Sequence, residues 1–318
     1  MGHKGDATKG IPMARAYAAL ILIGFVWGSN FIFIKMATEV LPPLQVVFLR
    51  VVVGFVPLAL VALWTGAIRR DQLRHLPHFA VMSVLATSFY YYGFVAGGAL
   101  LPSSVAGLLG GAIPIVTFLT TLVFLRSEQP NGLIAIGVAL GFVGIALTAR
   151  PWENGATVNL RGVAWLLSGV VSVGISFVYA RRYLAPLQLQ PVALAAWQTG
   201  LASLTLAVLT DFDGITVILD HPKALVALVL GLGVLGTGLA YLIYYYMVQK
   251  LGAVGASGAT YLPAVVAVVI GAAVGETIGL VEVVALVLTL GGVALIQLGG
   301  ARARAQSSLR PSDSRLPA

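Results

Sequence analysis

Arg50 is the only formal charge that lies well inside an apolar stretch of this sequence, in the segment 44–64. Placing a charged side chain at membrane depth is costly, so such a residue usually faces a cavity or a partner. A guanidinium in that position can hold a solute carboxylate through charge-assisted hydrogen bonds. Arg50 can also be structural, either snorkelling to the membrane interface or binding the carbonyls of a helix end, and the sequence leaves both interpretations open.

Aromatic and small polar side chains lie along the apolar stretches rather than only at their ends, where interfacial belts would place them. The hydroxyl of a tyrosine at that depth needs a protein partner, because lipid offers none. A cavity lined by such groups suits a largely neutral, partly apolar solute, although each tyrosine can equally be ordinary helix packing. The predicted contacts are Trp27, Ser29, Asn30, Phe31, Arg50, Tyr91, Ser176, Tyr179, Tyr245 and Tyr261.

Two prolines, Pro114 and Pro263, each lie midway through an apolar stretch. A proline inside a helix removes one hydrogen bond and clashes with the carbonyl four residues earlier, which here belongs to Gly110 or Ala259. The freed carbonyls could accept from a solute ammonium, and the paired kinks could act as gates or hinges. The alternative is that both prolines merely curve their helices, as many membrane prolines do.

Acids and histidines are missing from the centres of the apolar stretches. The four histidines, His3, His75, His78 and His221, all fall in predicted tails or loops, whereas pumps that relay protons usually keep carboxylates or histidines within the membrane. The chain also lacks cysteine and the motifs HExxH, GxSxG and GxxxxGK[ST]. We therefore predict no catalytic residue, no metal site, no cofactor and no proton coupling through a buried carboxylate.

Composition places all these residues in a membrane protein. Only 9% of the 318 residues are charged and 59% are hydrophobic, whereas soluble domains carry about 25% charged residues. Charge-free runs of about 20 residues favour helices over a barrel, whose strands alternate over about ten residues. The ten predicted spans are 16–34, 44–64, 79–97, 102–125, 132–149, 162–180, 191–210, 224–247, 252–274 and 279–298.

Lys and Arg residues are distributed unevenly between alternate loops. If the N-terminus is cytoplasmic, fourteen of them face the cytoplasm and four face outward, as expected for an even number of spans with both termini cytoplasmic. The net charge of +8 is therefore interpreted as a topology signal, and no nucleic-acid partner is predicted. The predicted location is a bacterial-type inner membrane, with the lipid bilayer and a small-molecule solute as partners.

The chain also resembles itself at offsets near 149 residues, which pair Arg50 with Gln198, Tyr92 with Tyr241, Pro114 with Pro263 and Glu128 with Glu276. Each copy holds five spans, so the second copy must enter the membrane in the opposite direction, as in many transporters. Apolar helices can align by composition alone, but the paired prolines and glutamates favour a duplication. The predicted divisions are a cytoplasmic tail 1–13, a first repeat 14–149, a periplasmic connector 150–161, a second repeat 162–300 and a cytoplasmic tail 301–318.

Three motifs resemble a known family. They are Trp27-Gly28-Ser29-Asn30-Phe31, the step Phe48-Leu49-Arg50, and the helix from Ser104 to Pro114 that is followed by Glu128. They are similar to the EamA family of the drug/metabolite transporter superfamily, over about residues 14–300, and the nearest likeness is to bacterial aromatic amino-acid exporters. The resemblance implies ten helices in two inverted five-helix repeats, a central cavity, and export of small metabolites. The second repeat departs from the motif, with Ile175 and Ser176 where Ser29 and Asn30 stand.

These features together predict an all-α membrane protein that exports small neutral metabolites by alternating access. Amino acids, including aromatic ones, are the predicted solutes, because no buried acid is present to balance a cationic solute. Without a buried carboxylate the carrier is predicted to be facilitative. The alternatives are an exporter of other amphipathic metabolites or drugs and, more remotely, a non-transporting membrane scaffold.

Overall fold

The computed structural model describes residues 7–124, 132–149, 158–243 and 262–309. Within those ranges the regular structure is helical and contains no strand. Nine helices of the described chain are long and apolar enough to cross a membrane, and a shorter apolar helix covers Leu262–Ala273. The predicted spans are therefore confirmed as helices in nine cases, and the predicted segment 252–274 is described only in its second half.

The first part of the chain begins with one long helix and ends with one of ordinary span length. Its elements are α1 (Ala7–Thr38), α2 (Pro43–Trp64), η1 (Arg70–His75), α3 (Leu76–Ser83), η2 (Val84–Ser88), α4 (Phe89–Gly98), α5 (Ser103–Gly110), α6 (Ile113–Phe124) and α7 (Gly132–Ala149). The elements from η1 to α4 form one continuous span, Arg70–Gly98. This span begins earlier than the predicted 79–97.

The second part repeats this pattern of long helices and short connections. Its elements are α8 (Leu160–Tyr179), η3 (Ala180–Leu184), η4 (Ala185–Leu187), α9 (Pro191–Leu209), η5 (Ile215–Asp220), α10 (Pro222–Val226), η6 (Ala227–Leu239), α12 (Leu262–Ala273) and α13 (Leu280–Leu309). Asn159 caps α8 by accepting from the backbone N–H groups of Arg161 and Gly162, which satisfies two of the free donors of a helix start.

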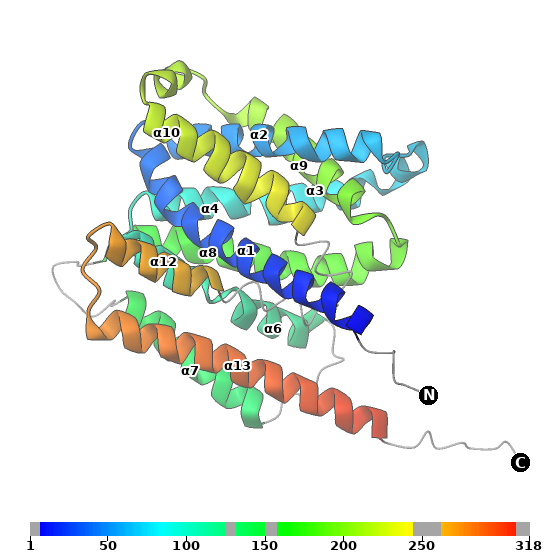
Figure 1. The fold of residues 1–318 in the computed structure, drawn as a ribbon, viewed down its shortest axis with the longest axis vertical. Helices are drawn as coiled ribbons and strands as arrows, with labels where there is room; N and C mark the ends of the chain where they lie inside the picture. Colours follow the sequence, from blue (N-terminus) through cyan, green and yellow to red (C-terminus); the bar gives the residue numbers. More distant parts are fainter. Residues whose placement is uncertain (1–6, 125–131, 150–157, 244–261, 310–318) are drawn as a thin grey trace, which may run out of the picture.

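The bundle has a near end and a far end. The near end holds the start of α1 and the end of α13, at the lower right of Figure 1. The far end holds the end of α1, the start of α5 and the connection between α12 and α13. Gln45, at the start of α2, donates to the carbonyls of Asp211 and Asp213 at 2.8 and 2.9 Å, so the connection after α9 also lies at the far end.

Helix α1 runs through the middle of the bundle and packs against α2, α4, α5, α10, η6 and α12. Helices α7 and α13 pack along each other at one side, at the bottom of Figure 1. Gly137 and Gly141 of α7 lie directly against the backbone of α13 at Gly292. This small-residue pair therefore has a packing role, because a side chain there would hold the two helices apart.

The span containing Pro114 is broken in the middle. Helix α5 ends at Gly110 and α6 begins at Ile113, so Pro114 lies in the first turn of α6, where a proline costs no helical hydrogen bond. Gly111 donates to the carbonyls of Gly107 and Leu108, and Ala112 donates to that of Leu109. The predicted kink is thus present as a break just before the proline. Pro263 lies in the first turn of the described part of α12, and the hinge role of both prolines stays a prediction.

Of the three described segments with π-helical backbone, in which the hydrogen bonds span five residues, η3 follows the end of α8, and the other two are η2, at Val84–Ser88, and η6, at Ala227–Leu239. The side chain of Ser172 donates to the carbonyl of Leu85 at 2.7 Å, and that of Thr237 donates to the carbonyl of Leu232 at 2.9 Å. Segments of this kind interrupt the regular helix and are frequent at functional sites. Both η2 and η6 lie beside the polar clusters described next.

Candidate functional site

Arg50 is buried in the protein interior, with only 2% of its surface exposed. Its guanidinium carbon lies 3.8 Å from the centroid of the Tyr91 ring, within the range of a cation–π contact. Its Nε donates to the hydroxyl of Thr237 at 3.4 Å, and that hydroxyl lies 3.4 Å from the Tyr91 hydroxyl. This burial excludes the interpretation that Arg50 snorkels to the membrane interface.

No carboxylate balances the charge of Arg50 within the described part of the chain. The two ion pairs found there join Lys35 to Glu276 and Arg69 to Asp71. A guanidinium has five N–H donors, and the only hydrogen bond formed by Arg50 among the described residues is the long one to Thr237. A buried cation without a counter-charge is unfavourable, so Arg50 is suited to bind an anionic group supplied by a solute.

Asn30 of α1 presents a second unsatisfied polar group beside η6, the segment that also holds Thr237. Its Oδ1 atom is buried and has no hydrogen-bond partner among the residues that the structure describes, and 8% of the residue is exposed. The amide packs against the backbone of Gly236, which directly precedes Thr237. Asn30 from α1 and Arg50 from α2 therefore contact adjacent residues of η6. An acceptor left unpaired in the interior is costly, and a solute N–H group could satisfy it.

A related polar cluster surrounds Gln198 of α9. Its amide nitrogen donates to the Thr87 hydroxyl at 2.7 Å and to the Tyr241 hydroxyl at 3.1 Å, and Gln198 is 4% exposed. The offset of 148 residues carries Arg50 to Gln198, and Thr87 and Tyr241 contact Gln198 as Thr237 and Tyr91 contact Arg50. Each cluster thus joins a long donor and a tyrosine from one part of the chain to a threonine on a π-helical segment of the other part.

Several other predicted contacts lie in ordinary packing or bond to their own helix. Phe31 packs 6.0 Å from the ring of Phe94, and Trp27 packs beside Ile23 and Ala240. The hydroxyls of Ser29 and Ser176 donate to the carbonyls of Val26 and Val173, each three residues earlier. Tyr245 and Tyr261 lie outside the described residues.

Tyr179 does not join the Arg50 cluster. Its hydroxyl lies 2.8 Å from Nδ1 of His78, and its ring packs 4.7 Å from that of Tyr183. The prediction that His75 and His78 lie in loops is wrong, because His75 belongs to η1 and His78 to α3, both within the span Arg70–Gly98. The error arises because Arg74, His75 and His78 look like loop residues, although the helix continues through this polar stretch.

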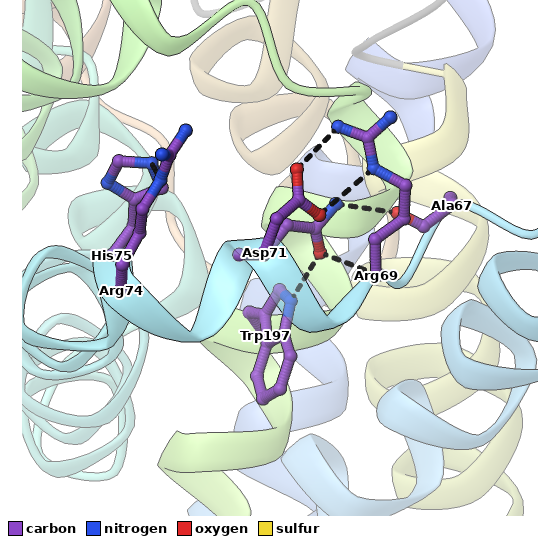
Figure 2. Close-up of polar contacts among 7 residues, drawn as sticks. Ala67, Arg69, Asp71, Arg74, His75 and Trp197 are labelled. Carbon is purple, nitrogen blue, oxygen red and sulfur yellow. Dashed lines mark hydrogen bonds and ion pairs between the residues drawn. The ribbon is translucent and has the colours of Figure 1, made fainter.

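A polar network fixes the turn between α2 and α3 onto α9 at the near end (Figure 2). The indole N–H of Trp197 donates to Oε1 of Gln72 at 2.8 Å, and the Gln72 amide nitrogen donates to the carbonyl of Ala67 at 2.7 Å. Arg69 pairs with Asp71 through two hydrogen bonds at the exposed rim. The donors and acceptors of this network bond to one another, so we assign the network to folding of the turn.

Glu276 is the main polar feature of the far end, and the sequence indicated it only as a loop residue paired with Glu128. Its Oε1 accepts from the backbone N–H of Ser103 at 2.6 Å. Its Oε2 accepts from the N–H of Ser104 at 2.9 Å and from the Ser104 hydroxyl at 2.6 Å. Lys35 lies 3.9 Å from Oε1. The carboxylate therefore caps the start of α5, where backbone N–H groups and the helix dipole favour an anion.

These contacts determine how Glu276 titrates. Partial burial acts to raise the pKa of Glu276, but the hydrogen bonds from Ser104 and Ser103 and the charge of Lys35 outweigh it and hold the pKa below its ordinary value of 4.5. A depressed pKa in the folded state means that the carboxylate stabilises the protein above pH 4.5 and loses this effect as the pH falls through the lowered pKa.

We expect the variant Glu276→Gln to melt at a lower temperature than the wild type at pH 7, because it loses a charge-assisted cap. The difference between the two melting temperatures should shrink as the pH falls from about 4.5 through the lowered pKa, where the carboxyl of the folded wild type also becomes neutral. Thermal unfolding of the purified proteins in detergent, followed by tryptophan fluorescence between pH 3.5 and 7.5, measures this difference. A gap that does not change with pH would contradict the assignment.

Comparison with known proteins decides the family. The model of the EamA-like transporter family matches this chain in two segments, residues 14–150 and 160–298. The chain belongs to the EamA-like transporter family. The predicted resemblance is thereby confirmed at the level of the family, and this EamA-like protein is a membrane transporter. The described helices that are long and apolar enough to cross a membrane agree with that assignment.

Relatives of this EamA-like protein carry transporter names. The "Uncharacterized inner membrane transporter YedA" of Escherichia coli (strain K12) is 26% identical over 290 residues, covering 89% of this chain and 90% of that protein. The "Probable terminal-alkyne amino-acid exporter" of Streptantibioticus cattleyicolor is 26% identical over 259 residues, covering 81% and 84%. One solved crystal structure has the same fold, with a TM-score of 0.57 and 17% identity over 91% of this chain and 98% of that one.

Proposed function

We propose that this EamA-like transporter exports small neutral metabolites across an inner membrane, with amino acids, including aromatic ones, as its main solutes. The observation that carries the proposal is the buried guanidinium of Arg50, which has no carboxylate partner among the described residues. An amino acid would supply the missing carboxylate. The name of the Streptantibioticus relative, which is 26% identical, supports the same solute class.

The residues of the solute site in this proposal come from four elements of the bundle, α1, α2, α4 and η6. Arg50 of α2 binds the carboxylate, with Thr237 of η6 and the Tyr91 ring of α4 holding the guanidinium in place. The unpaired Oδ1 of Asn30 accepts from the solute ammonium. Trp27, Phe31 and the tyrosines line the remainder, so that a partly apolar side chain is tolerated. Ser29, Ser176 and Tyr179 keep a secondary place, because each already has a protein partner.

Alternating access between two inverted five-helix repeats, 14–149 and 162–300, is the mechanism in this proposal. Two features support it: the family model matches twice along the chain, and the Arg50 and Gln198 clusters are built from the same kinds of group. Ten spans with both termini cytoplasmic fit the distribution of Lys and Arg. The far end then faces outward, and Pro114 and Pro263 are the hinges. No buried acid is described near Arg50, so transport is facilitative.

The alternative solutes are other amphipathic metabolites or drugs, and a series of analogues separates them from amino acids. We expect tryptophan and phenylalanine to raise the thermal unfolding midpoint of the purified transporter, because a ligand that binds only the folded state stabilises it. The corresponding amines and methyl esters, which lack the carboxylate, should have no effect. Equal stabilisation by tryptophan and tryptamine would show that the carboxylate is not recognised, and would favour the alternative.

A further inference from the structure

Three segments meet around the carboxylate of Glu276 at the far end. Lys35 comes from the last turn of α1 and Ser103 and Ser104 from the first turn of α5, whereas Glu276 follows α12. The glutamate therefore belongs to the segment 160–298, while its partners belong to the segment 14–150. Its side chain is 12% exposed and accepts three hydrogen bonds from α5. Glu276 thus joins the two halves by hydrogen bonds between residues more than 170 positions apart in the sequence.

Helices α1, α5 and α12 also contact one another one helical turn further into the bundle than Glu276. Gly107 of α5 lies against Ala267 of α12 and near the ring of Phe31 of α1. Gly271 of α12 contacts the Glu276 carboxylate. Each residue of the deeper contact lies four positions along its helix from a residue near that carboxylate: Phe31 from Lys35, Gly107 from Ser103, and Ala267 from Gly271. A spacing of four residues is about one turn of helix. Glu276 therefore covers the junction of α1, α5 and α12.

Above this junction the surface is hollowed. A recess of about 350 Å³ is lined by Ile32, Lys35, Met36, Glu39, Val274, Gly275 and Glu276. The charged groups around Glu276 in the recess are Lys35 of α1, at 3.9 Å, and Glu39, which directly follows α1. Helix α5 contributes only the neutral Ser103 and Ser104. Glu276 therefore separates a water-accessible recess from a tightly packed interior.

We propose that Glu276 is a clasp between the two halves, which keeps the far end of the solute path closed until the carboxylate leaves the start of α5. Release exposes two backbone N–H groups of α5 that then need water as a partner, and the recess can supply that water. Opening of the clasp and entry of water into the junction are therefore one event. This inference rests on the proposed function for its meaning in transport, but the motion itself can be measured without a solute.

The chain contains no cysteine, so the variant Ala267→Cys places a single thiol in the junction. We expect this thiol to react slowly with a maleimide in purified protein at pH 7, because Ala267 is 1% exposed. Adding Glu276→Ala should accelerate the reaction by at least about tenfold, since three hydrogen bonds to a charged acceptor are lost. Ser104→Ala removes only one of them and should give a smaller acceleration. Glu39→Gln is the matched control, because it neutralises an acid of the same recess that makes no bond to α5.

Two results would overturn the clasp. One is an equally slow thiol in the folded Glu276→Ala and Ser104→Ala proteins, which would reduce Glu276 to a static helix cap. The other is an acceleration by Glu39→Gln as large as that by Glu276→Ala, which would make the effect one of surface charge. Amino-acid uptake is scored separately. If the labelling rate depends on Glu276 but the protein transports no amino acid, the clasp is supported and the proposed function is rejected. If the protein transports amino acids but the labelling rate does not depend on Glu276, only the clasp is rejected.

Discussion

Arg50→Met should lower saturable amino-acid uptake by about 10- to 100-fold, the range expected from loss of a hydrogen-bonded charge worth about 1.5–3 kcal/mol. Methionine can occupy much of the space of the arginine stem but cannot bind a carboxylate. Arg50→Lys keeps the charge without the planar fork of donors, so its uptake should fall between that of the wild type and Arg50→Met. Uptake by reconstituted liposomes at several solute concentrations measures the change as a rise in KM.

The stability of the folded protein should not fall when Arg50 is replaced by methionine. Arg50 is buried beside Tyr91 without a carboxylate among its described neighbours, and replacing an unbalanced buried charge by an apolar residue is neutral or stabilising. We therefore expect Arg50→Met to keep or raise the unfolding midpoint. Gln198→Met is the matched control, at the residue that the 148-residue offset pairs with Arg50, where a neutral side chain bonds Thr87 and Tyr241. Gln198→Met should lower the unfolding midpoint strongly and the affinity for the amino acid only slightly. Unchanged uptake by folded Arg50→Met would show that Arg50 is structural.

Gly93→Ala should destabilise the protein by about 1–3 kcal/mol, the usual cost of forcing extra volume into a packed site. Helices α4 and α8 cross with their backbones in contact at this point. A Cβ atom on Gly93 would lie 2.7 Å from the carbonyl oxygen of Trp165 and 2.8 Å from the nitrogen of Gly169. Backbone atoms cannot move aside as a flexible side chain can, so the two helices must separate.

Gly291→Ala makes the same chemical change at a helical glycine with open space around it. There we expect stabilisation of about 0.5–1 kcal/mol, because alanine favours the helix more than glycine does. The two variants are compared by thermal unfolding in the same detergent. Equal effects of the two substitutions would show that the α4–α8 crossing is looser than described.

Much of the helical framework follows directly from the sequence. Long apolar runs without charges have no other stable form in lipid, and for this reason nine of the predicted spans appear as helices among the described residues. Helix ends were predicted less well. The span Arg70–Gly98 begins with Arg70, Asp71 and Arg74, and a polar helix start that projects from the membrane has the composition of a loop.

The candidate site was only partly predictable, because its partners come from distant parts of the chain. A lone arginine in an apolar run is visible in the sequence, but Thr237, its hydrogen-bond partner, is one neutral residue in a run of small and apolar ones. Of three consecutive tyrosines, burial singles out Tyr91, at 5% exposure. Ser29 and Ser176 look like cavity residues, yet their hydroxyls bond to their own helices. Such bonds cannot be read from hydropathy.

Glu276 shows the same limit at the far end. A glutamate between two apolar helices is typical of a solvated loop, and the internal repeat singles it out only by pairing it with Glu128. Its partners, Ser103 and Ser104, are more than 170 residues away in the sequence. Only the packing of α12 against α5 brings the carboxylate to the start of that helix. Glu128 lies outside the described residues.

Uptake into proteoliposomes that contain the purified transporter, with a panel of radiolabelled amino acids and no imposed ion gradient, tests the central claim most directly. We predict saturable uptake of aromatic and other neutral amino acids by the wild type, with little uptake by Arg50→Met. Uptake that starts only when a proton or sodium gradient is imposed would contradict the facilitative mechanism. If no amino acid on the panel moves under either condition, the proposal that this EamA-like protein carries amino acids is wrong.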